Sequence, residues 1–321
     1  MFGIIGQEKL IELFHTSLEN NRLSHSYLIE GDEGLCSINV AKYMAASLLC
    51  KQGKQGACTH CSICRRIQDN NHPDIRVIDE KTVKIDNIRK AIEEVHKRPY
   101  EANHKVIIIK GFHTTTIEGQ NAILKTLEEP PDTATIILLA NDTLSILDTI
   151  KSRCQILKLF RVDTNIIKNK LIHDGYSNDR AGFGSLYGEG NYGESIKACS
   201  EGFIVLRNQI MEVALDIFSC SKFEVMNYAQ SISNNKDNIF DILNIFTSIY
   251  RDIIMVKLDE NNSKIINRDN FQIIVEESYR LSYNRLDKAL RVINDTRKRL
   301  ASDTNFQLTM EVMLLNIQEA K

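Results

Sequence analysis

The chain has 321 residues, of which 43% are hydrophobic and 26% charged, a balance typical of a globular protein with two or three domains. Lys and Arg total 40 against 42 Asp and Glu, and the formal charge of −2 excludes a bulk attraction to nucleic acid, so any such contact must be local or shared. Early charges at the N-terminus exclude a secretion signal, and charges within the apolar stretch 239–258 exclude a membrane span, so a cytoplasmic protein without membrane contact is expected.

Short apolar runs alternate with helical patterns over the first half of the chain, which predicts an α/β fold with a parallel sheet flanked by helices. Pro130 and Pro131 end the last of these helices. Because a residue before proline is disfavoured in the helical region, Glu129 is expected to be its final or penultimate residue. The predicted strands are 26–30, 75–79, 106–110, 135–140 and 155–159, and the predicted helices are 4–20, 37–50, 83–97 and 117–128.

After about residue 160 the strand signal fades and helical patterns continue to the C-terminus. The Gly-rich segment from Gly182 to Gly193 is expected to form turns and helix ends. Two later stripes of apolar residues at helical spacing predict core-facing helices. These stripes are Ile239, Leu243, Phe246, Tyr250 and Ile253, and Leu286, Leu290, Ile293 and Leu300.

The first predicted strand runs into the frame of a phosphate-binding loop. The working pattern is G-x-x-x-x-G-K-[ST], in which backbone amides cradle phosphates, the lysine reaches the outer ones and the hydroxyl holds Mg²⁺. Gly31 fits, but Cys36, Ser37 and Ile38 stand at the positions of the second glycine, the lysine and the hydroxyl. Loss of the cation and the metal ligand predicts weak triphosphate binding at best. The alternative is that Gly31 and Gly34 form an ordinary turn.

Four of the eight cysteines are clustered with the spacing C-x7-C-x2-C-x2-C. In a cytosolic protein such a cluster favours metal binding over disulfides, and four thiolates form the closed tetrahedral shell of structural zinc. His60 is a less favoured substitute ligand. The alternatives are free thiols, or a zinc finger that reads nucleic acid, which the scarcity of basic and aromatic neighbours disfavours. The predicted zinc ligands are Cys50, Cys58, Cys61 and Cys64; Cys36, Cys154, Cys199 and Cys220 are expected to be core or surface thiols.

Several segments occur together in an order that carries a family resemblance. They are residues 2–7 (FGIIGQ), 23–28 (LSHSYL), the four-cysteine insertion, 121–131 (NAILKTLEEPP) and the triplet Ser152-Arg153-Cys154. With them the chain resembles the delta-prime subunits of the bacterial replicative clamp loader, within the AAA+ superfamily. The resemblance is strong over residues 1–160 and only architectural afterwards.

The resemblance implies an AAA+ P-loop-type α/β module over residues 1–160, with a zinc-binding insertion at 50–64. It further implies a small helical lid over 161–203 and an all-helical collar over 204–321 that joins subunits. The implied partners are delta and tau/gamma subunits in a hetero-pentamer of the DNA polymerase III holoenzyme. Through that complex the chain would meet the sliding clamp and the primer–template DNA onto which the clamp is loaded.

The resemblance also implies that this chain does not hydrolyse ATP, because delta-prime subunits typically act as a rigid stator. Where active relatives carry an acidic pair after the third strand, this chain has Lys110 and Gly111, and where the lid carries a nucleotide-sensing arginine it has Glu194. Glu118 lies nearby, but on the following helix. Asp79 and Asp86 are expected to be solvated or capping residues. No functional ATP site is expected at Gly31, Gly34, Ser37 and Ile38.

Two other classes of protein remain as alternatives. An active tau/gamma-type ATPase shares the zinc cluster and the Ser-Arg-Cys triplet, but Ser37, Ile38, Lys110 and Gly111 disfavour it. A zinc-containing nucleic-acid-binding module with a decayed nucleotide fold is disfavoured by the lack of surplus positive charge.

Arg153 is the residue to which the resemblance assigns a catalytic role, in trans, on the γ-phosphate of a neighbour's ATP. A guanidinium suits that role because it is always charged and offers a planar fork to phosphate oxygens. The alternative is a local ion pair, for example with Asp148. Asn141 matches a sensor position or is merely structural. Lys125 faces phosphate or DNA, or belongs to a helix with a purely structural role.

Overall fold

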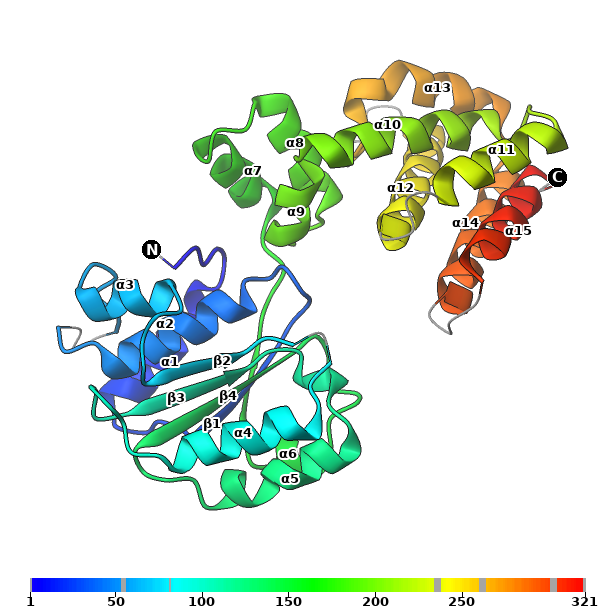
Figure 1. Ribbon diagram of the computed structural model, residues 1–321. Coiled ribbons are helices and arrows are strands. Elements are labelled where there is room, and N and C mark those ends of the chain that lie inside the picture. Colours follow the sequence, from blue (N-terminus) through cyan, green and yellow to red (C-terminus); the bar gives the residue numbers. More distant parts are fainter. Residues whose placement is uncertain are drawn as a thin grey trace. The chain divides into compact units, whose positions relative to one another are not determined.

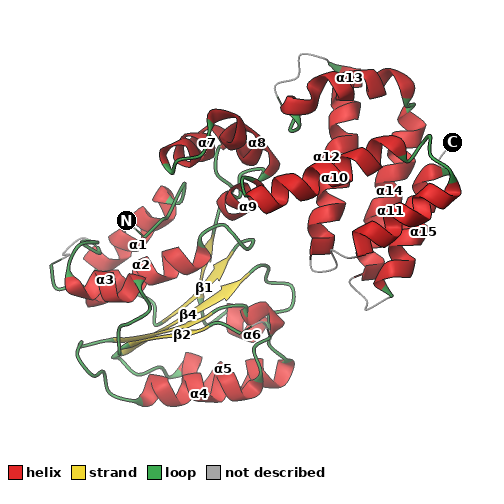
Figure 2. Cartoon of the chain, turned by 45° about the horizontal axis from the view of Figure 1, so that its top comes forward, coloured by secondary structure: helices red, strands yellow, loops and turns green. Residues whose placement is uncertain are grey.

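The computed structural model describes residues 2–52, 56–80, 82–233, 238–259, 264–300 and 305–319. Residues 53–55 of the predicted zinc insertion lie outside the described residues. The chain divides into two compact units, shown in Figures 1 and 2. The first comprises Met1–Ile167 with Gly190–Gly193, and the second Lys168–Glu189 with Glu194–Lys321.

The first unit is built on a five-stranded sheet with the order β2-β3-β4-β1-β5, in which every neighbouring pair is parallel. β3 and β4 are buried along their whole length, as expected of parallel strands covered on both faces. Because β1 lies between β4 and β5, the loop that follows it is at a topological switch point, where open α/β sheets bind ligands. The strands are β1 (Ser26–Glu30), β2 (Ile75–Ile78), β3 (Lys105–Ile109), β4 (Ala134–Ala140) and β5 (Gln155–Lys158).

Helices cover both faces of this sheet (Figure 1). Side chains alternate along a strand, so Tyr27 and Ile29 of β1 enter one hydrophobic core while Leu28 enters the other. Full burial of each such side chain stabilises the fold by about 1.5–3 kcal/mol. The Tyr27 core is closed by α1 (Glu8–Glu19), α2 (Ser37–Leu49) and α3 (Ser62–Gln68), and the Leu28 core by α4 (Ile85–His96), α5 (Ile117–Glu128) and α6 (Asp148–Lys151).

All five predicted strands are present, each within one residue of its predicted ends. The first predicted helix is corrected, because α1 begins at Glu8 and not at residue 4. Gly3 and Gly6 have φ values of +68° and +67°, which belong to the left-handed region and not to a right-handed helix. Glu129 is also corrected: it is the residue after the last helical position of α5, with φ −126°. The short helices α3 and α6 were not predicted from the sequence.

The N-terminal segment before α1 is tied to the residue that follows β5. Gln7 is buried, its Nε2 donates to the carbonyl of Phe160 at 2.7 Å, and its Oε1 accepts the Phe160 amide at 3.1 Å. This pair of bonds gives a structural role to the glutamine at the end of the segment FGIIGQ. The local sequence pattern did not predict this contact, because its two ends are 153 positions apart.

The second unit is all-helical among its described residues (Figure 2). In its hydrophobic core, Phe183 and Ala198 lie in one cluster with buried side chains of the long helices that follow. Among these, α12 contributes the fully buried Phe246 and Tyr250. Both predicted apolar stripes therefore face a core. The helices of this unit are α8 (Asn178–Tyr187), α10 (Glu201–Asp216), α11 (Lys222–Ser233), α12 (Ile239–Leu258), α13 (Phe271–Arg280), α14 (Tyr283–Leu300) and α15 (Phe306–Gln318). Two further helices, α7 (Thr164–His173) and α9 (Tyr192–Ala198), have residues in both units.

No helix in the described part of the chain is long and apolar enough to cross a membrane. The predicted boundary between a lid at 161–203 and a collar at 204–321 falls inside α10. The three-part division of the chain stays a prediction.

The expectation that the Gly-rich segment forms only turns and helix ends is wrong for Gly182 and Gly184, which lie inside α8. A Cβ on Gly184 would lie 2.4 Å from Cys199 Sγ and 2.7 Å from the Ser195 carbonyl oxygen. The absent side chain therefore lets α8 approach α9 closely. This close packing outweighs the weak helix propensity of glycine.

Candidate functional sites

The loop after β1 leads directly into the N-terminus of α2, as a phosphate-binding loop does. Gly34 has φ +93° and Cys36 has φ +65°, so both occupy the left-handed region that favours glycine. For a residue with a Cβ this conformation costs roughly 1–2 kcal/mol. The amide of Gly31 donates to the carbonyl of Ala140 at 3.0 Å, which joins the start of the loop to the end of β4.

The chain's own segment 190–193 packs on this loop. The Asn191 side-chain amide donates to the Glu33 carbonyl at 2.6 Å, and the Gly193 amide donates to the Gly34 carbonyl at 3.0 Å. A Cβ on Gly34 would lie 2.3 Å from Asn191 Oδ1, and one on Gly193 would lie 2.5 Å from the Gly34 Cα. Both glycines therefore permit a contact between two backbone segments, and Asn191 is buried in it. We call this contact, formed by residues 33–34 and 191–193, the loop clasp.

The charged side chains around the loop are paired within the first unit. Lys110, directly after β3, lies 3.1 Å from Asp79 and 3.9 Å from Glu33. Arg161 lies 2.8 Å from Asp32. Such half-exposed pairs are each worth about 0–1 kcal/mol. The residue that follows β3 is therefore a cation, Lys110, and not a carboxylate that could bind a metal ion.

The other acidic candidates have structural roles. Glu118 lies in the first turn of α5, where the backbone amide at its own position and the Thr116 hydroxyl lower its pKa. Asp86 lies in the first turn of α4 and pairs with Arg89 at 3.6 Å. The prediction that Glu118 is on the following helix and that Asp79 and Asp86 are solvated or capping is confirmed.

The remaining nucleotide-related positions are less informative. The Asn141 amide donates to His113 Nδ1 at 3.3 Å, and the Asn141 side chain is exposed. Lys125 is exposed on α5. Glu194 lies in the first turn of α9 and belongs to the second unit. The roles suggested for these three residues stay predictions.

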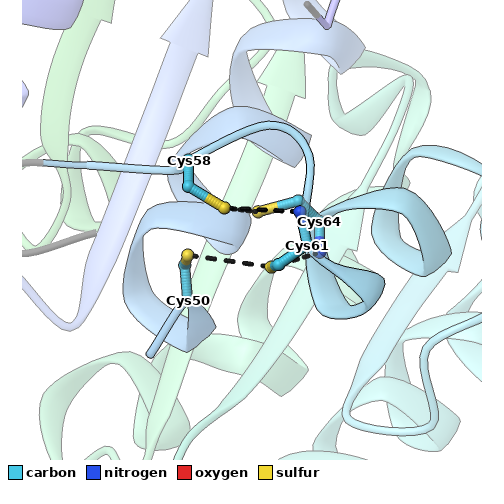
Figure 3. Close-up of side chains that lie close together, drawn as sticks. All are labelled: Cys50, Cys58, Cys61 and Cys64. Atoms are coloured by element: carbon cyan, nitrogen blue, oxygen red, sulfur yellow. Dashed lines mark hydrogen bonds between the residues drawn. The ribbon is translucent and has the colours of Figure 1, made fainter. Parts of the chain in front are cut away.

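The four clustered cysteines converge on one point (Figure 3), with all four sulfur atoms within 4.8 Å of one another. Cys50 Sγ lies 3.9 Å from Cys61 Sγ, and Cys58 Sγ lies 3.8 Å from Cys64 Sγ. A tetrahedral shell with metal–sulfur bonds of about 2.3 Å places its sulfurs about 3.8 Å apart. The observed spacing therefore fits a structural zinc ion.

Local backbone geometry prepares these ligands. Cys50 follows the last residue of α2, Cys61 is the N-cap of α3 and Cys64 lies in its first turn. The Cys61 amide donates to Cys58 Sγ and the Cys64 amide to Cys61 Sγ, each at 3.4 Å. Such N–H donors favour thiolates, the form that binds a metal.

The thiols of the cluster differ in acidity without a metal. The His60 amide, followed by other hydrogen bonds, lowers the pKa of Cys58 to about 6, whereas burial raises the pKa of Cys64. A bound dication would favour the thiolate of every ligand. The His60 ring is exposed, and its Nδ1 lies 2.6 Å from the Cys58 carbonyl oxygen. It is not among the four residues that converge, so the geometry favours the all-cysteine set.

Arg153 follows α6 and is anchored by its backbone, because its carbonyl accepts the Ser26 hydroxyl of β1 at 3.0 Å. Its guanidinium pairs with Glu128, the last residue of α5. Asp148, the expected local partner, pairs instead with Lys151 at 2.9 Å. The suggested pair with Asp148 is therefore wrong, and the role of Arg153 beyond its ion pair stays a prediction. Nothing in the sequence spacing pointed to Glu128, which is 25 positions away.

The neighbouring Cys154 has no part in the metal cluster. It is buried, and burial raises the pKa of its thiol to about 12. It is an inert core thiol, as expected from its isolated position in the sequence.

Two family models match the chain. The model described as "DNA polymerase III, delta subunit" matches residues 6–163, and the one described as "DNA polymerase III, delta subunit, C terminal" matches residues 201–319. The chain is 28% identical over 319 residues to the DNA polymerase III subunit delta' of Bacillus subtilis, covering 98% of this chain and 96% of that protein.

Other relatives match only part of the chain. The DNA polymerase III subunit tau/gamma of Haemophilus influenzae is 33% identical over 172 residues, which are 53% of this chain and 25% of the relative. Among solved structures, a DNA polymerase III gamma-subunit-related protein of Thermotoga maritima superposes with a TM-score of 0.51 at 16% identity, over 97% of this chain and 99% of that one. At that identity the match shows a shared fold.

Proposed function

The chain belongs to the DNA polymerase III delta-subunit family, and from this premise we propose that it is a delta-prime-like clamp-loader subunit that does not hydrolyse ATP. The observation that carries the proposal is a relative with that name matched over nearly the whole length of both chains. The tau/gamma relatives, in contrast, extend far beyond the matched part. Its partners would be delta and tau/gamma subunits in a hetero-pentamer.

The loop after β1 supports the absence of hydrolysis. Ser37 and Ile38 supply neither the cation nor the metal-binding hydroxyl that a triphosphate requires. Lys110, which pairs with Asp79, stands where a carboxylate would order Mg²⁺. Within the complex, the chain would instead help to load the sliding clamp onto primer–template DNA. Since the related proteins are replication subunits, we also infer that this work takes place in the cytoplasm.

Arg153 is the residue proposed to serve a neighbour's ATP. The Arg153 side chain is about one-third exposed, and the residue follows a short helix that includes the buried Ile150. An arginine supplied in trans neutralises charge that develops on the transferred phosphoryl group and accelerates hydrolysis by about 10³–10⁵. The zinc ion would be structural, held by Cys50, Cys58, Cys61 and Cys64.

Reconstitution with the cognate ATPase subunits tests this function. Arg153→Ala should lower DNA-stimulated ATP hydrolysis at least several-fold, because one site loses its transition-state cation, while assembly measured by size-exclusion chromatography is retained. Arg89→Ala, which removes an exposed arginine that pairs with Asp86 on α4, is the matched control and should behave as the wild type. Unchanged turnover in Arg153→Ala would reject the role of Arg153.

The alternative, an active tau/gamma-type ATPase, is tested separately. The purified chain alone should show no ATP turnover above background. A clear hydrolysis rate that co-purifies with the chain would favour the alternative.

A further inference from the structure

Both terminal nitrogens of the Arg153 guanidinium are engaged by the chain's own groups. Nη2 pairs with the Glu128 carboxylate. Nη1 donates to the Thr149 carbonyl at 2.8 Å and contacts the Ser152 hydroxyl at 3.4 Å. Because each terminal nitrogen carries two N–H groups and Nη1 already makes two contacts, the fork formed by Nη1 and Nη2 can bind phosphate oxygens only after at least one of these bonds is exchanged.

The guanidinium of Arg153 is not fully hydrogen-bonded, and its ion pair with Glu128 is partly exposed. Arg153 Nε is buried and has no hydrogen-bond partner among the described residues, so this pose does not satisfy the whole guanidinium. The Arg153 side chain is 32% exposed and that of Glu128 is 48% exposed. Exposed ion pairs of this kind are weak, so the pair can open without a large energetic barrier.

The position of Glu128 is unfavourable for its helix. It is the last residue of α5, and the C-terminal end of a helix carries partial negative charge, which repels a carboxylate. Glu129, the next residue, brings a second negative charge to the same end. Pairing with Arg153 offsets this repulsion at Glu128.

We propose that Glu128 is a positioning residue that holds Arg153 in the unassembled chain and competes with the neighbour's phosphate for Nη2. This proposal rests on the proposed role of Arg153. A triphosphate carries more negative charge than a carboxylate and accepts a two-point contact from the fork, so it displaces Glu128 when both are present. Glu128 thereby raises the ATP concentration at which Arg153 engages and leaves the chemical step unchanged.

The first test uses the isolated chain and does not depend on ATP. Modification of Arg153 by phenylglyoxal, followed by mass spectrometry, should be at least about threefold faster in Glu128→Gln, because the guanidinium is released. Glu129→Gln changes the same charge one residue away and should leave the rate unchanged. Glu128→Asp keeps a carboxylate and should stay near the wild-type rate. Equal rates in Glu128→Gln and the wild type would overturn the holding contact.

The second test uses the reconstituted complex with primed DNA. Glu128→Gln should lower the KM for ATP about two- to fivefold with kcat unchanged, and Glu129→Gln should leave both constants unchanged. In an Arg153→Ala background, Glu128→Gln should have no further effect, because Glu128 acts only through Arg153. A changed kcat at constant KM, or an equal effect in the Arg153→Ala background, would overturn the proposal.

The two hypotheses fail in different ways. If Arg153→Ala leaves hydrolysis unchanged, the function proposed for Arg153 is wrong whatever Glu128 does. If Arg153→Ala lowers hydrolysis while Glu128→Gln matches the wild type in both assays, only the role of Glu128 is wrong. Thermal unfolding of each variant, expected to be within a few degrees of the wild type, separates these outcomes from a folding defect.

Discussion

Asp74 is a fully buried carboxylate that organises the chain between α4 and β3. It precedes β2 and accepts the backbone amides of Tyr100, Glu101 and Ala102 at 2.5, 2.8 and 2.7 Å. Burial alone would raise the pKa of Asp74, but these three donors outweigh it, and the net effect is a lowered pKa. The carboxylate thus serves as the hydrogen-bond acceptor for three consecutive backbone amides, at residues 100–102.

We predict that Asp74→Ala lowers the free energy of unfolding by about 2–4 kcal/mol at pH 7, because three backbone amides lose a charged acceptor. Since the folded pKa is depressed, the contribution of Asp74 is full above its unfolded pKa of about 4 and is lost as the pH falls through its lower folded pKa. Urea unfolding of wild type and variant between pH 7 and pH 3 should show the difference shrink in acid. Exposed Asp132→Ala is the control, and a constant difference across this range would contradict the prediction.

At the scale of elements, the zinc cluster joins the end of α2 to the start of α3. Cys50 and Cys64 are buried, and both helices pack on the same face of the sheet. The ligand spacing was readable because the four cysteines lie within 15 consecutive positions and the two-residue gaps determine how their sulfurs converge. The helix α3 was missed, since a seven-residue element gives too short a periodic pattern.

We predict one zinc ion per chain and its loss in Cys58→Ser. Removal of the metal should lower the Tm of the first unit by about 5–10 °C, because binding free energy is part of folding free energy and 1 kcal/mol corresponds to about 2–4 °C in a domain of this size. Metal analysis and thermal unfolding with and without a chelator measure both effects. Cys220→Ser, outside the cluster, should retain the metal. A wild-type content far below one equivalent would contradict the prediction.

At the scale of the whole molecule, each unit is organised by polar contacts that link distant parts of the sequence. In the second unit the buried Arg207 pairs with Asp269 at 2.6 Å, bonds to Asn267 at 2.9 Å and lies 4.3 Å from the centre of the Phe183 ring. Asp252, also buried, accepts the side-chain amide of Asn267 at 2.7 Å. These groups connect α8, α10 and α12 with the segment before α13.

In the first unit the loop clasp likewise links two segments that are far apart in the sequence, residues 33–34 and 191–193.

We predict that millimolar Mg-ATP leaves the Tm of the isolated chain unchanged within about 1 °C, because the loop after β1 lacks the lysine and the hydroxyl that bind a triphosphate. A ligand at one hundred times its Kd would add about 2.7 kcal/mol and shift the Tm by several degrees. Asn191→Ala should lower stability through loss of the clasp without creating nucleotide stabilisation, because Ser37 and Ile38 remain. A Tm that rises with ATP concentration would contradict the prediction.

The sequence alone determined the order of the strands, the cysteine spacing, the altered loop and the Ser-Arg-Cys triplet, because each depends on residues close together in the chain. The sequence did not determine which polar groups pair with the residues of these features. Glu128 reaches Arg153 across 25 positions, and Asn191 reaches Glu33 across 158. Helical and strand patterns record which side chains face a core, but they carry no information about which polar groups meet once the elements pack. The tertiary structure therefore decided that residues 191–193 pack on the loop after β1 and that Arg153 pairs with the Glu128 carboxylate.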